Sequence, residues 1–229
     1  MTDPPAVPVR DVELVVLDMA GTTVHDGGEV PAAFRAALAA HGVAVTDEEL
    51  AGVRGASKHE VIRTLVTRHQ PDALPSLVDE VYDEFRAALA ERYRAGVRAV
   101  EGVEDAFDWL RRRDVRIALN TGFDRSIAEL LLDALGWRDG VVEAVVCGDE
   151  VPRGRPAPYL IFRAMEAAGA TSVHRVVNVG DTELDLRAGW NAAVGWNVGV
   201  LGGAHPRERL EQAPHTHLID SAAALPELW

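Results

Sequence analysis

The feature that most constrains the fold is an alternation of short β-branched runs with helical segments, which one long stretch interrupts. Runs rich in valine and isoleucine occur at 12–17, 115–119, 142–146, 175–179 and 194–200. Segments with helical periodicity lie between them, at 102–113, 125–136, 157–169 and 183–192. Such alternation predicts a parallel sheet covered by helices on both faces, an α/β architecture of the Rossmann-like kind.

The interruption lies between residues 30 and 96. This stretch reads as consecutive helices, at 30–42, 46–50, 57–69 and 76–96, with no strand between them. We therefore predict an α-helical cap inserted after the first strand. The expected domains are a core of residues 1–28 and 97–229 and a cap of residues 29–96.

Composition and charge exclude several function classes. With 23 basic and 36 acidic residues the net charge is -13, so the average field would repel a nucleic acid or an anionic membrane surface. A single cysteine excludes an internal disulfide and a cysteine-based zinc cluster. No apolar run approaches the ~20 residues that span a bilayer, and the opening MTDPPAVPVR lacks a signal peptide's apolar stretch. We expect a cytoplasmic protein.

Polar residues follow four of these segments, where a parallel sheet gathers its ligands. They are Asp18 in LDMAGT, Thr121 in NTGF, Arg155 in GRPAP, and the pair Asp181 and Asp185 in GDTELD. Three carboxylates facing one another need a cation, and their hard oxygens suit Mg²⁺. Thr121 and Arg155 would then hold phosphoryl oxygens. Each residue alone has a bland interpretation as a turn former, a helix cap or a surface cation.

The set in this order resembles the haloacid dehalogenase superfamily of phosphotransferases and hydrolases, over about residues 11–200. The resemblance implies a Rossmann-like core, a mobile helical cap, Mg²⁺, and Asp18 as a nucleophile that forms a transient aspartyl-phosphate. Most phosphatases of the superfamily carry a general acid two residues after the nucleophile, but here that position is Ala20. Loss of such an acid typically costs ~10²–10⁴ in rate.

Lys58 is the only lysine in the chain, beside 22 arginines. An amine can form a Schiff base with a carbonyl, whereas a guanidinium stays charged. The SKHE segment reads as a capping box with Ser57 as N-cap and Glu60 as its partner, which places Lys58 in the first turn of a helix. The helix end lowers a lysine pKa by less than one unit, and Arg54 and Arg63, if near, would lower it further, so burial under the cap must make the largest contribution.

Ala20 and Lys58 together make the chain similar to the phosphonoacetaldehyde hydrolase (phosphonatase) family. That resemblance implies that Lys58 forms an imine with an aldehyde substrate, and that the imine acts as the electron sink for carbon–phosphorus cleavage. It implies Asp18, the Ala20 carbonyl and Asp181 as metal ligands, with Asp185 as a ligand or a support. The implied phosphoryl-binding residues are Thr22, Thr121, Gly122 and Arg155.

The chain departs from the family at two positions, which leaves alternatives open. Val61 stands where the family has a histidine, and Phe123 stands where it has a tyrosine. His59 lies nearby but should point elsewhere on the helix. A phosphatase or phosphotransferase with Lys58 as an anion contact, and a non-catalytic binding protein on the same fold, are therefore the second and third hypotheses. In each case the expected partner is a small phosphonate or phosphate.

One face of a predicted cap helix carries large apolar and aromatic residues that could belong to the cap core or to a homodimer contact. Tyr82, Phe85, Leu89 and Tyr93 recur at helical spacing on one face. We favour cap core for this stripe over a homodimer contact, and both interpretations stay open.

Overall fold

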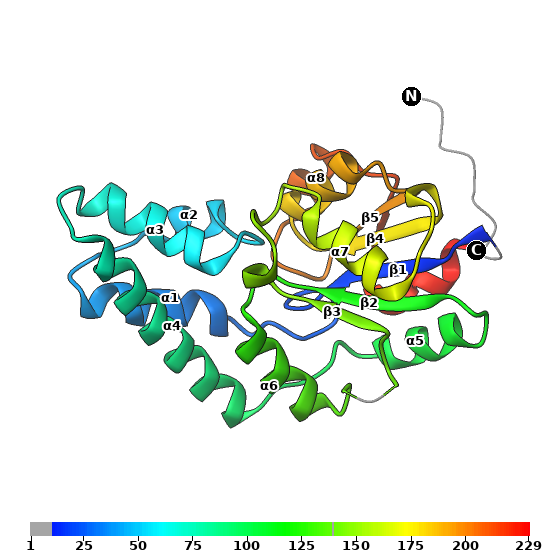
Figure 1. Cartoon of the computed structure of the whole chain (residues 1–229), viewed down its shortest axis with the longest axis horizontal. Coiled ribbons are helices and arrows are strands. Elements are labelled where there is room, and N and C mark those ends of the chain that lie inside the picture. Colours follow the sequence, from blue (N-terminus) through cyan, green and yellow to red (C-terminus); the bar gives the residue numbers. More distant parts are fainter. Residues whose placement is uncertain (1–10, 139) are drawn as a thin grey trace.

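A computed structural model describes residues 11–138 and 140–229. Its centre is a six-stranded parallel sheet in the order β3-β2-β1-β4-β5-β6 (Figure 1). The strands are β1 Leu14–Asp18, β2 Arg116–Asn120, β3 Ala144–Val146, β4 Val176–Gly180, β5 Trp196–Val200 and β6 His217–Ile219.

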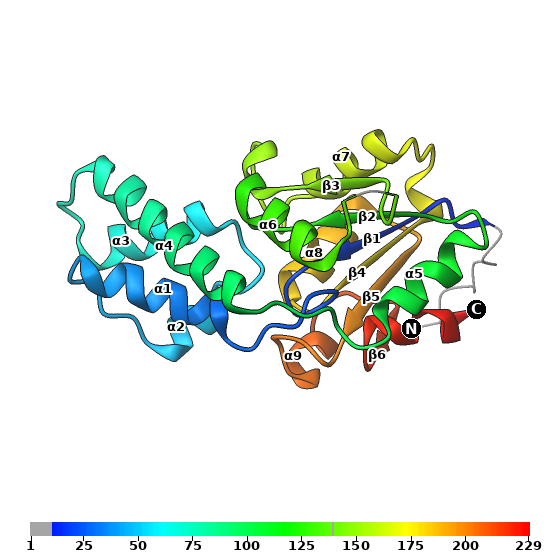
Figure 2. The ribbon, with the colours of Figure 1, turned by 90° about the horizontal axis from the view of Figure 1, so that it is seen from below.

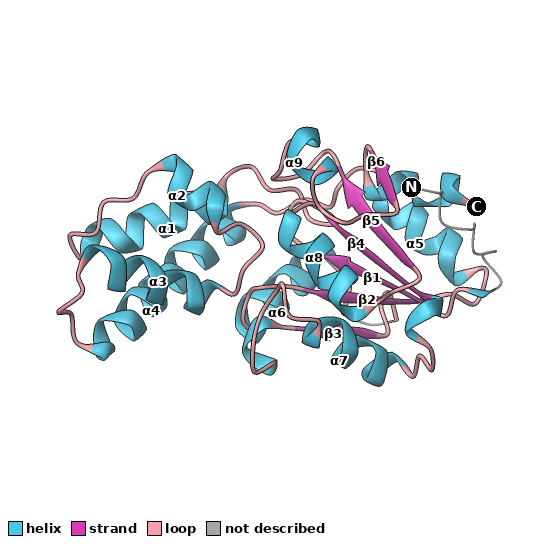
Figure 3. Cartoon of the chain, turned by 90° about the horizontal axis from the view of Figure 1, so that it is seen from above, coloured by secondary structure: helices cyan, strands magenta, loops and turns pink. Residues whose placement is uncertain are grey.

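Each strand of the central pair β1 and β4 is buried along its whole length because helices cover both faces of the sheet. On one face Leu14 and Val16 pack against α7 and α8. On the other, Val15 and Leu17 belong to the core cluster that includes α5 and α6 (Figures 2 and 3). The covering helices are α5 Val103–Arg111, α6 Arg125–Leu135, α7 Tyr159–Ala168, α8 Glu183–Ala192 and the short α9 Arg207–Glu211.

The four helices between β1 and α5 lie together beyond one end of the sheet (Figure 1). α4 packs against α1 and α3, and its N-terminal end contains Pro75, where a missing N–H costs nothing. Phe34 of α1 stacks on Phe85 of α4 with ring centroids 4.3 Å apart. These helices are α1 Glu29–Ala40, α2 Asp47–Gly52, α3 Lys58–His69 and α4 Pro75–Ala95.

Phe85, Leu89 and Tyr93 are buried within the chain, so the structure supports the cap-core interpretation of this stripe. A homodimer stays a prediction. Within residues 11–138 and 140–229, no helix is both long and apolar enough to cross a bilayer. The expectation about a signal peptide concerns residues 1–10, which lie outside the described residues.

The expected capping box at the start of α3 is wrong. Ser57 is the N-cap, but its side chain accepts no capping hydrogen bond. The N–H of Lys58 instead donates to the Gly122 carbonyl of the core at 3.3 Å. The helix end is therefore satisfied by a contact between distant segments, which local spacing cannot predict.

Candidate active site

The site lies where β1, β2 and β4 end, and it faces α2, α3 and the loop between them. One pocket is lined by Asp18, Ala20, Thr121, Gly122, Arg155 and Asp181 from the sheet side. Lys58 and Arg54 line it from the cap side, together with Asp26 and apolar residues. Seven of the nine predicted site residues, Lys58 included, thus line this pocket. Thr22 and Asp185 lie behind the pocket wall and contact the residues that line it.

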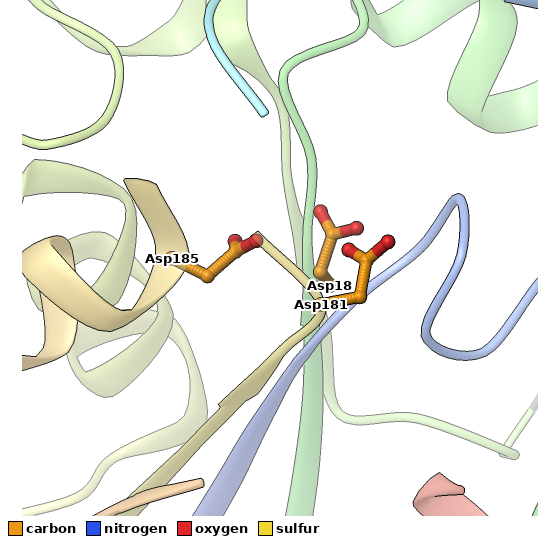
Figure 4. A group of neighbouring side chains, drawn as sticks. All are labelled: Asp18, Asp181 and Asp185. Carbon is orange, nitrogen blue, oxygen red and sulfur yellow. The ribbon is translucent and has the colours of Figure 1, made fainter. Parts of the chain in front are cut away.

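Three carboxylates form the centre of the site. Asp18, Asp181 and Asp185 each offer an oxygen within 4.8 Å of the others, and all three side chains are buried. Figure 4 shows Asp18 and Asp181 side by side, with Asp185 approaching from α8. Burial, followed by repulsion from Asp18 and Asp185, raises the pKa of Asp181 well above its usual range. A divalent cation would relieve that repulsion, and carboxylate oxygens suit Mg²⁺, so this donor set fits the expected metal.

Asp185 caps α8 and also forms an ion pair with Arg155. Its Oδ2 accepts the Thr182 N–H at 3.0 Å, and its own N–H donates to Thr182 Oγ1 at 3.2 Å, which together cap α8. Its Oδ1 lies 2.9 Å from Arg155 Nη1. Both oxygens are thus engaged by protein groups, which favours a supporting role over direct ligation.

Arg155 connects the carboxylates. Its Nη2 lies 2.7 Å from Asp18 Oδ1, and the same nitrogen donates to the Asn120 side chain and, at 3.2 Å, to the Asn120 carbonyl. Burial raises the pKa of Asp18 to about 6, and the adjacent Arg155 charge opposes that rise. The guanidinium is therefore a fixed, buried cation beside the proposed nucleophile. Asn120 was missed by the sequence analysis, although it directly precedes Thr121.

Thr22 takes a different place from Thr121. Its hydroxyl donates to Asp181 Oδ1 at 3.4 Å, and Thr22 is not among the pocket-lining residues. Thr121 lines the pocket, and its Oγ1 accepts the Phe123 N–H at 3.1 Å. The geometry thus gives Thr22 a contact to the metal-ligand candidate, while Thr121 faces the substrate space.

Lys58 is buried at the first residue of α3, with 8 % of its surface exposed. Its Nζ donates to the Ala56 carbonyl at 3.1 Å and lies over the Phe123 ring. Burial lowers the pKa of Lys58 to about 8, and the charge of Asp18 partly opposes this. Burial is the largest cause of the lowered Lys58 pKa, as the sequence analysis expected. The charges that act most on Lys58 are those of Asp18, Arg155, Asp26 and Asp185, rather than the expected Arg54 and Arg63.

The lack of a side chain at Gly122 allows the cap segment around Lys58 to contact the loop after β2. A Cβ at this position would lie 2.6 Å from the Ala56 carbonyl oxygen and 3.4 Å from Lys58 Nζ. Glycine therefore permits the contact between β2's loop and the segment that carries the amine. His59 points away, as expected, with Nε2 3.0 Å from Asp79 Oδ1 on the cap surface.

A core loop after β5 was not expected at the site. The Ala204 N–H donates to Asp181 Oδ2 at 2.6 Å, while the Ala204 carbonyl accepts from Arg54 Nη1 at 2.9 Å. This loop therefore contacts a metal-ligand candidate and the cap at the same time. The sequence analysis did not single out this loop, whose sequence is GGAHP.

A family model described as haloacid dehalogenase-like hydrolase matches residues 12–193. The chain belongs to the haloacid dehalogenase-like hydrolases. A protein from Paraburkholderia xenovorans named phosphonoacetaldehyde hydrolase is 30% identical over 208 residues, which cover 84% of this chain and 76% of that protein. The resemblance inferred from the motifs is thereby confirmed at the level of the family.

Several solved structures share the fold. A hydrolase from Pseudomonas syringae matches with a TM-score of 0.84 and 20% identity, over 94% of this chain and 96% of that one. A phosphonoacetaldehyde hydrolase like protein from Oleispira antarctica matches with a TM-score of 0.81 and 23% identity, over 97% and 92%. At these identities the likeness concerns the fold alone.

Proposed function

We propose that this hydrolase cleaves the carbon–phosphorus bond of phosphonoacetaldehyde or a close relative. The observation that carries the proposal is the buried amine of Lys58, which lines the same pocket as Asp18 and has a pKa lowered to about 8. At pH 7 roughly one tenth of such an amine is neutral and able to attack a carbonyl, against less than one thousandth for an ordinary lysine. The name carried by the curated relatives supports the same reaction.

The proposed chemistry begins at Lys58. Its Nζ attacks the aldehyde carbon, and loss of water leaves an imine. Asp18 then attacks phosphorus, and the electron pair of the carbon–phosphorus bond moves into the imine to give an enamine. Protonation and hydrolysis of the enamine release the aldehyde product and free Lys58. Water attacks the aspartyl-phosphate, which releases phosphate and restores Asp18.

This route explains why Ala20 is tolerated where related phosphatases have an acid. The leaving group is an enamine, which needs no proton at the moment the bond breaks. The residues that would hold Mg²⁺ are Asp18, Asp181 and the Ala20 carbonyl. The metal would neutralise charge on the phosphoryl oxygens. Thr121, Gly122 and Arg155 would orient these oxygens from the sheet side.

We also propose that residues 29–96 act as a cap that closes over the core of residues 1–28 and 97–229. Lys58 reaches the pocket only because the start of α3 touches the loop after β2. Tyr82 of α4 donates to Asp124 Oδ2 at 2.9 Å, a second contact between cap and core. Closure would exclude water from the imine and from the aspartyl-phosphate.

A phosphatase acting on a small phosphorylated metabolite is the second candidate. Val61 is buried in the cap core, so no proton-transfer group follows Lys58 on that helix face. Phe123 supplies an aromatic ring without a hydroxyl. In this alternative Lys58 binds a substrate anion and forms no imine. The third candidate keeps the fold without turnover, as a binding protein.

Reductive trapping tests the proposal. Borohydride with phosphonoacetaldehyde and Mg²⁺ should attach a reduced adduct at Lys58, which mass spectrometry can assign because the chain has one lysine. Lys58→Arg keeps the charge and should abolish both the adduct and phosphate release. A Lys58→Arg variant that still hydrolyses phosphate esters would favour the second candidate. Binding without phosphate release across phosphonates and phosphate esters would favour the third.

A further inference from the structure

The pocket contains a cation that the reaction of phosphonoacetaldehyde does not use. Arg54 lies in the loop between α2 and α3 and lines the pocket together with Lys58. Its Nη1 donates to the Ala204 carbonyl at 2.9 Å. Among residues 11–138 and 140–229, no ion pair shorter than 4.0 Å involves Arg54. The guanidinium thus presents charge to the pocket without a carboxylate partner.

Asp26, an acidic residue of the same pocket, forms no ion pair within 4.0 Å with Arg54. Its Oδ1 accepts the Gly28 N–H at 3.0 Å within the turn that leads to α1. Burial raises the pKa of Asp26 and the charge of Arg54 opposes that rise, although no hydrogen bond joins the two side chains. With Nη1 bonded to the Ala204 carbonyl, the Nε and Nη2 donors of Arg54 remain available to a ligand.

The rest of the cap wall is apolar. It is formed by Val30, Phe34, Leu50 and Val53. A guanidinium at the edge of such a wall has little competition from water for a bound anion, and its planar fork suits a carboxylate. In phosphonoacetaldehyde the phosphonyl group is assigned to Thr121, Gly122 and Arg155, and the carbonyl to Lys58. That substrate has no further group for Arg54.

We propose that Arg54 forms a carboxylate subsite, and that the preferred substrates are phosphonates whose carbonyl chain also carries a carboxylate, such as 2-oxo-3-phosphonopropanoate. The proposal rests on the imine chemistry proposed above. Lys58 condenses with the ketone and water leaves. Asp18 attacks phosphorus, and the electron pair of the carbon–phosphorus bond moves into the imine to give an enamine. The enamine is then protonated at carbon. Hydrolysis of both covalent intermediates then gives phosphate and a 2-oxo acid.

Competition between substrates tests the proposal in the unmodified protein. With Mg²⁺ present, we expect kcat/KM for 2-oxo-3-phosphonopropanoate to exceed that for phosphonoacetaldehyde at least tenfold. Equal values, or a preference for the aldehyde, would overturn the carboxylate subsite. Because this comparison needs no variant, it decides the question even where a substitution fails to fold.

Arg54→Gln keeps a donor for the Ala204 carbonyl and removes the charge. We expect it to lower the ratio of the two kcat/KM values, oxo acid over aldehyde, about 100-fold. Arg63→Gln is the matched control, since Arg63 lines a separate groove on the cap and should leave the ratio unchanged. An unchanged ratio in Arg54→Gln would show that Arg54 only holds the loop, and would contradict the proposal.

Borohydride trapping distinguishes failure of the carboxylate subsite from failure of the imine chemistry. An adduct at Lys58 with the aldehyde alone would leave the proposed function standing and reject the carboxylate subsite. Absence of an adduct and of phosphate with both phosphonates would reject the imine chemistry, and the subsite with it. Adducts with both, formed faster with the oxo acid, are the expected result.

Discussion

The amine nitrogen of Lys58 lies 5.1 Å from the ring centroid of Phe123. The ring face favours the charged amine, while the loss of water around it favours the neutral form. The pKa of Lys58 falls to about 8, with burial as the largest cause, so desolvation prevails. The ring thus holds the amine at the pocket, while burial lowers its pKa towards neutral pH.

Activity on phosphonates should depend on pH through this amine. Below its pKa of about 8 the neutral fraction falls tenfold per pH unit, so kcat/KM should rise with that slope from pH 7, where Asp18 is already ionised, and level off above 8. A stopped assay of phosphate release with Mg²⁺ from pH 6 to 9.5 measures this. A flat profile over that range would speak against attack by Lys58.

Replacing Lys58 should stabilise the protein while it destroys activity. The unfolded chain holds the Lys58 proton up to its ordinary pKa of 10.5, whereas the folded chain loses it near 8. Between these pH values the unfolded state binds more protons than the folded state, so the free energy of unfolding rises with pH. At pH 7, below both pKa values, the folded chain bears the whole cost of burying the charged amine. Lys58→Met should raise the free energy of unfolding at pH 7 by up to about 3 kcal/mol.

Urea titrations at pH 7 and pH 10 check this, because the gain should shrink at the higher pH. Lys58→Arg is the comparison variant, since it retains a charge at both values and should show no such gain. A Lys58→Met variant that is less stable than the parent at pH 7 would mean that burial of the charged amine does not destabilise the folded protein.

Magnesium should stabilise the protein through Asp181. We expect Mg²⁺ to raise the Tm of the unmodified chain, because it offsets repulsion among buried carboxylates. Asp181→Asn should remove that rise and should itself raise the Tm of the metal-free protein by a few degrees, since the amide carries no charge. Differential scanning fluorimetry with EDTA and with Mg²⁺ measures both effects. A Mg²⁺ shift retained in Asp181→Asn would place the ion elsewhere.

Gly122 should be intolerant of any side chain. In Gly122→Ala the new Cβ would meet the Ala56 carbonyl oxygen at 2.6 Å, so the segment that carries Lys58 must move. We expect a loss of about 1–3 kcal/mol in unfolding free energy and at least tenfold slower trapping at Lys58. Gly52→Ala is the control, because a Cβ there meets nothing within 4 Å. Equal trapping rates in the two variants would contradict the docking role of Gly122.

The contact between Tyr82 and Asp124 should help to keep the cap on the core. Asp124 also accepts the Ile127 N–H at 3.0 Å as the cap of α6, so it links the two parts. Tyr82→Phe removes only the hydroxyl and should raise KM for phosphonates severalfold with a smaller change in kcat. The expected cost in stability is about 0.5–1.5 kcal/mol. A change in kcat with KM constant would argue against a role in closure.

The order of strands and helices along the chain was enough to predict the sheet and the residues at its active edge. The predicted strand at 115–119 corresponds to β2 Arg116–Asn120, and the predicted helix at 183–192 matches α8. Asp18, Thr121 and Asp181 could be grouped in advance because the carboxyl ends of parallel strands meet at one edge. These features follow from short-range periodicity, which reads directly from neighbouring residues.

The surroundings of those residues follow from contacts between segments that are distant in the chain. The missing capping box at Ser57, the burial of Lys58 and the placement of Arg54 all depend on contacts with Gly122 or Ala204, far away in the sequence. Desolvation and charge pairing are properties of such long-range neighbours. A motif can therefore name an amine or a guanidinium, but the folded chain sets its charge and its partners.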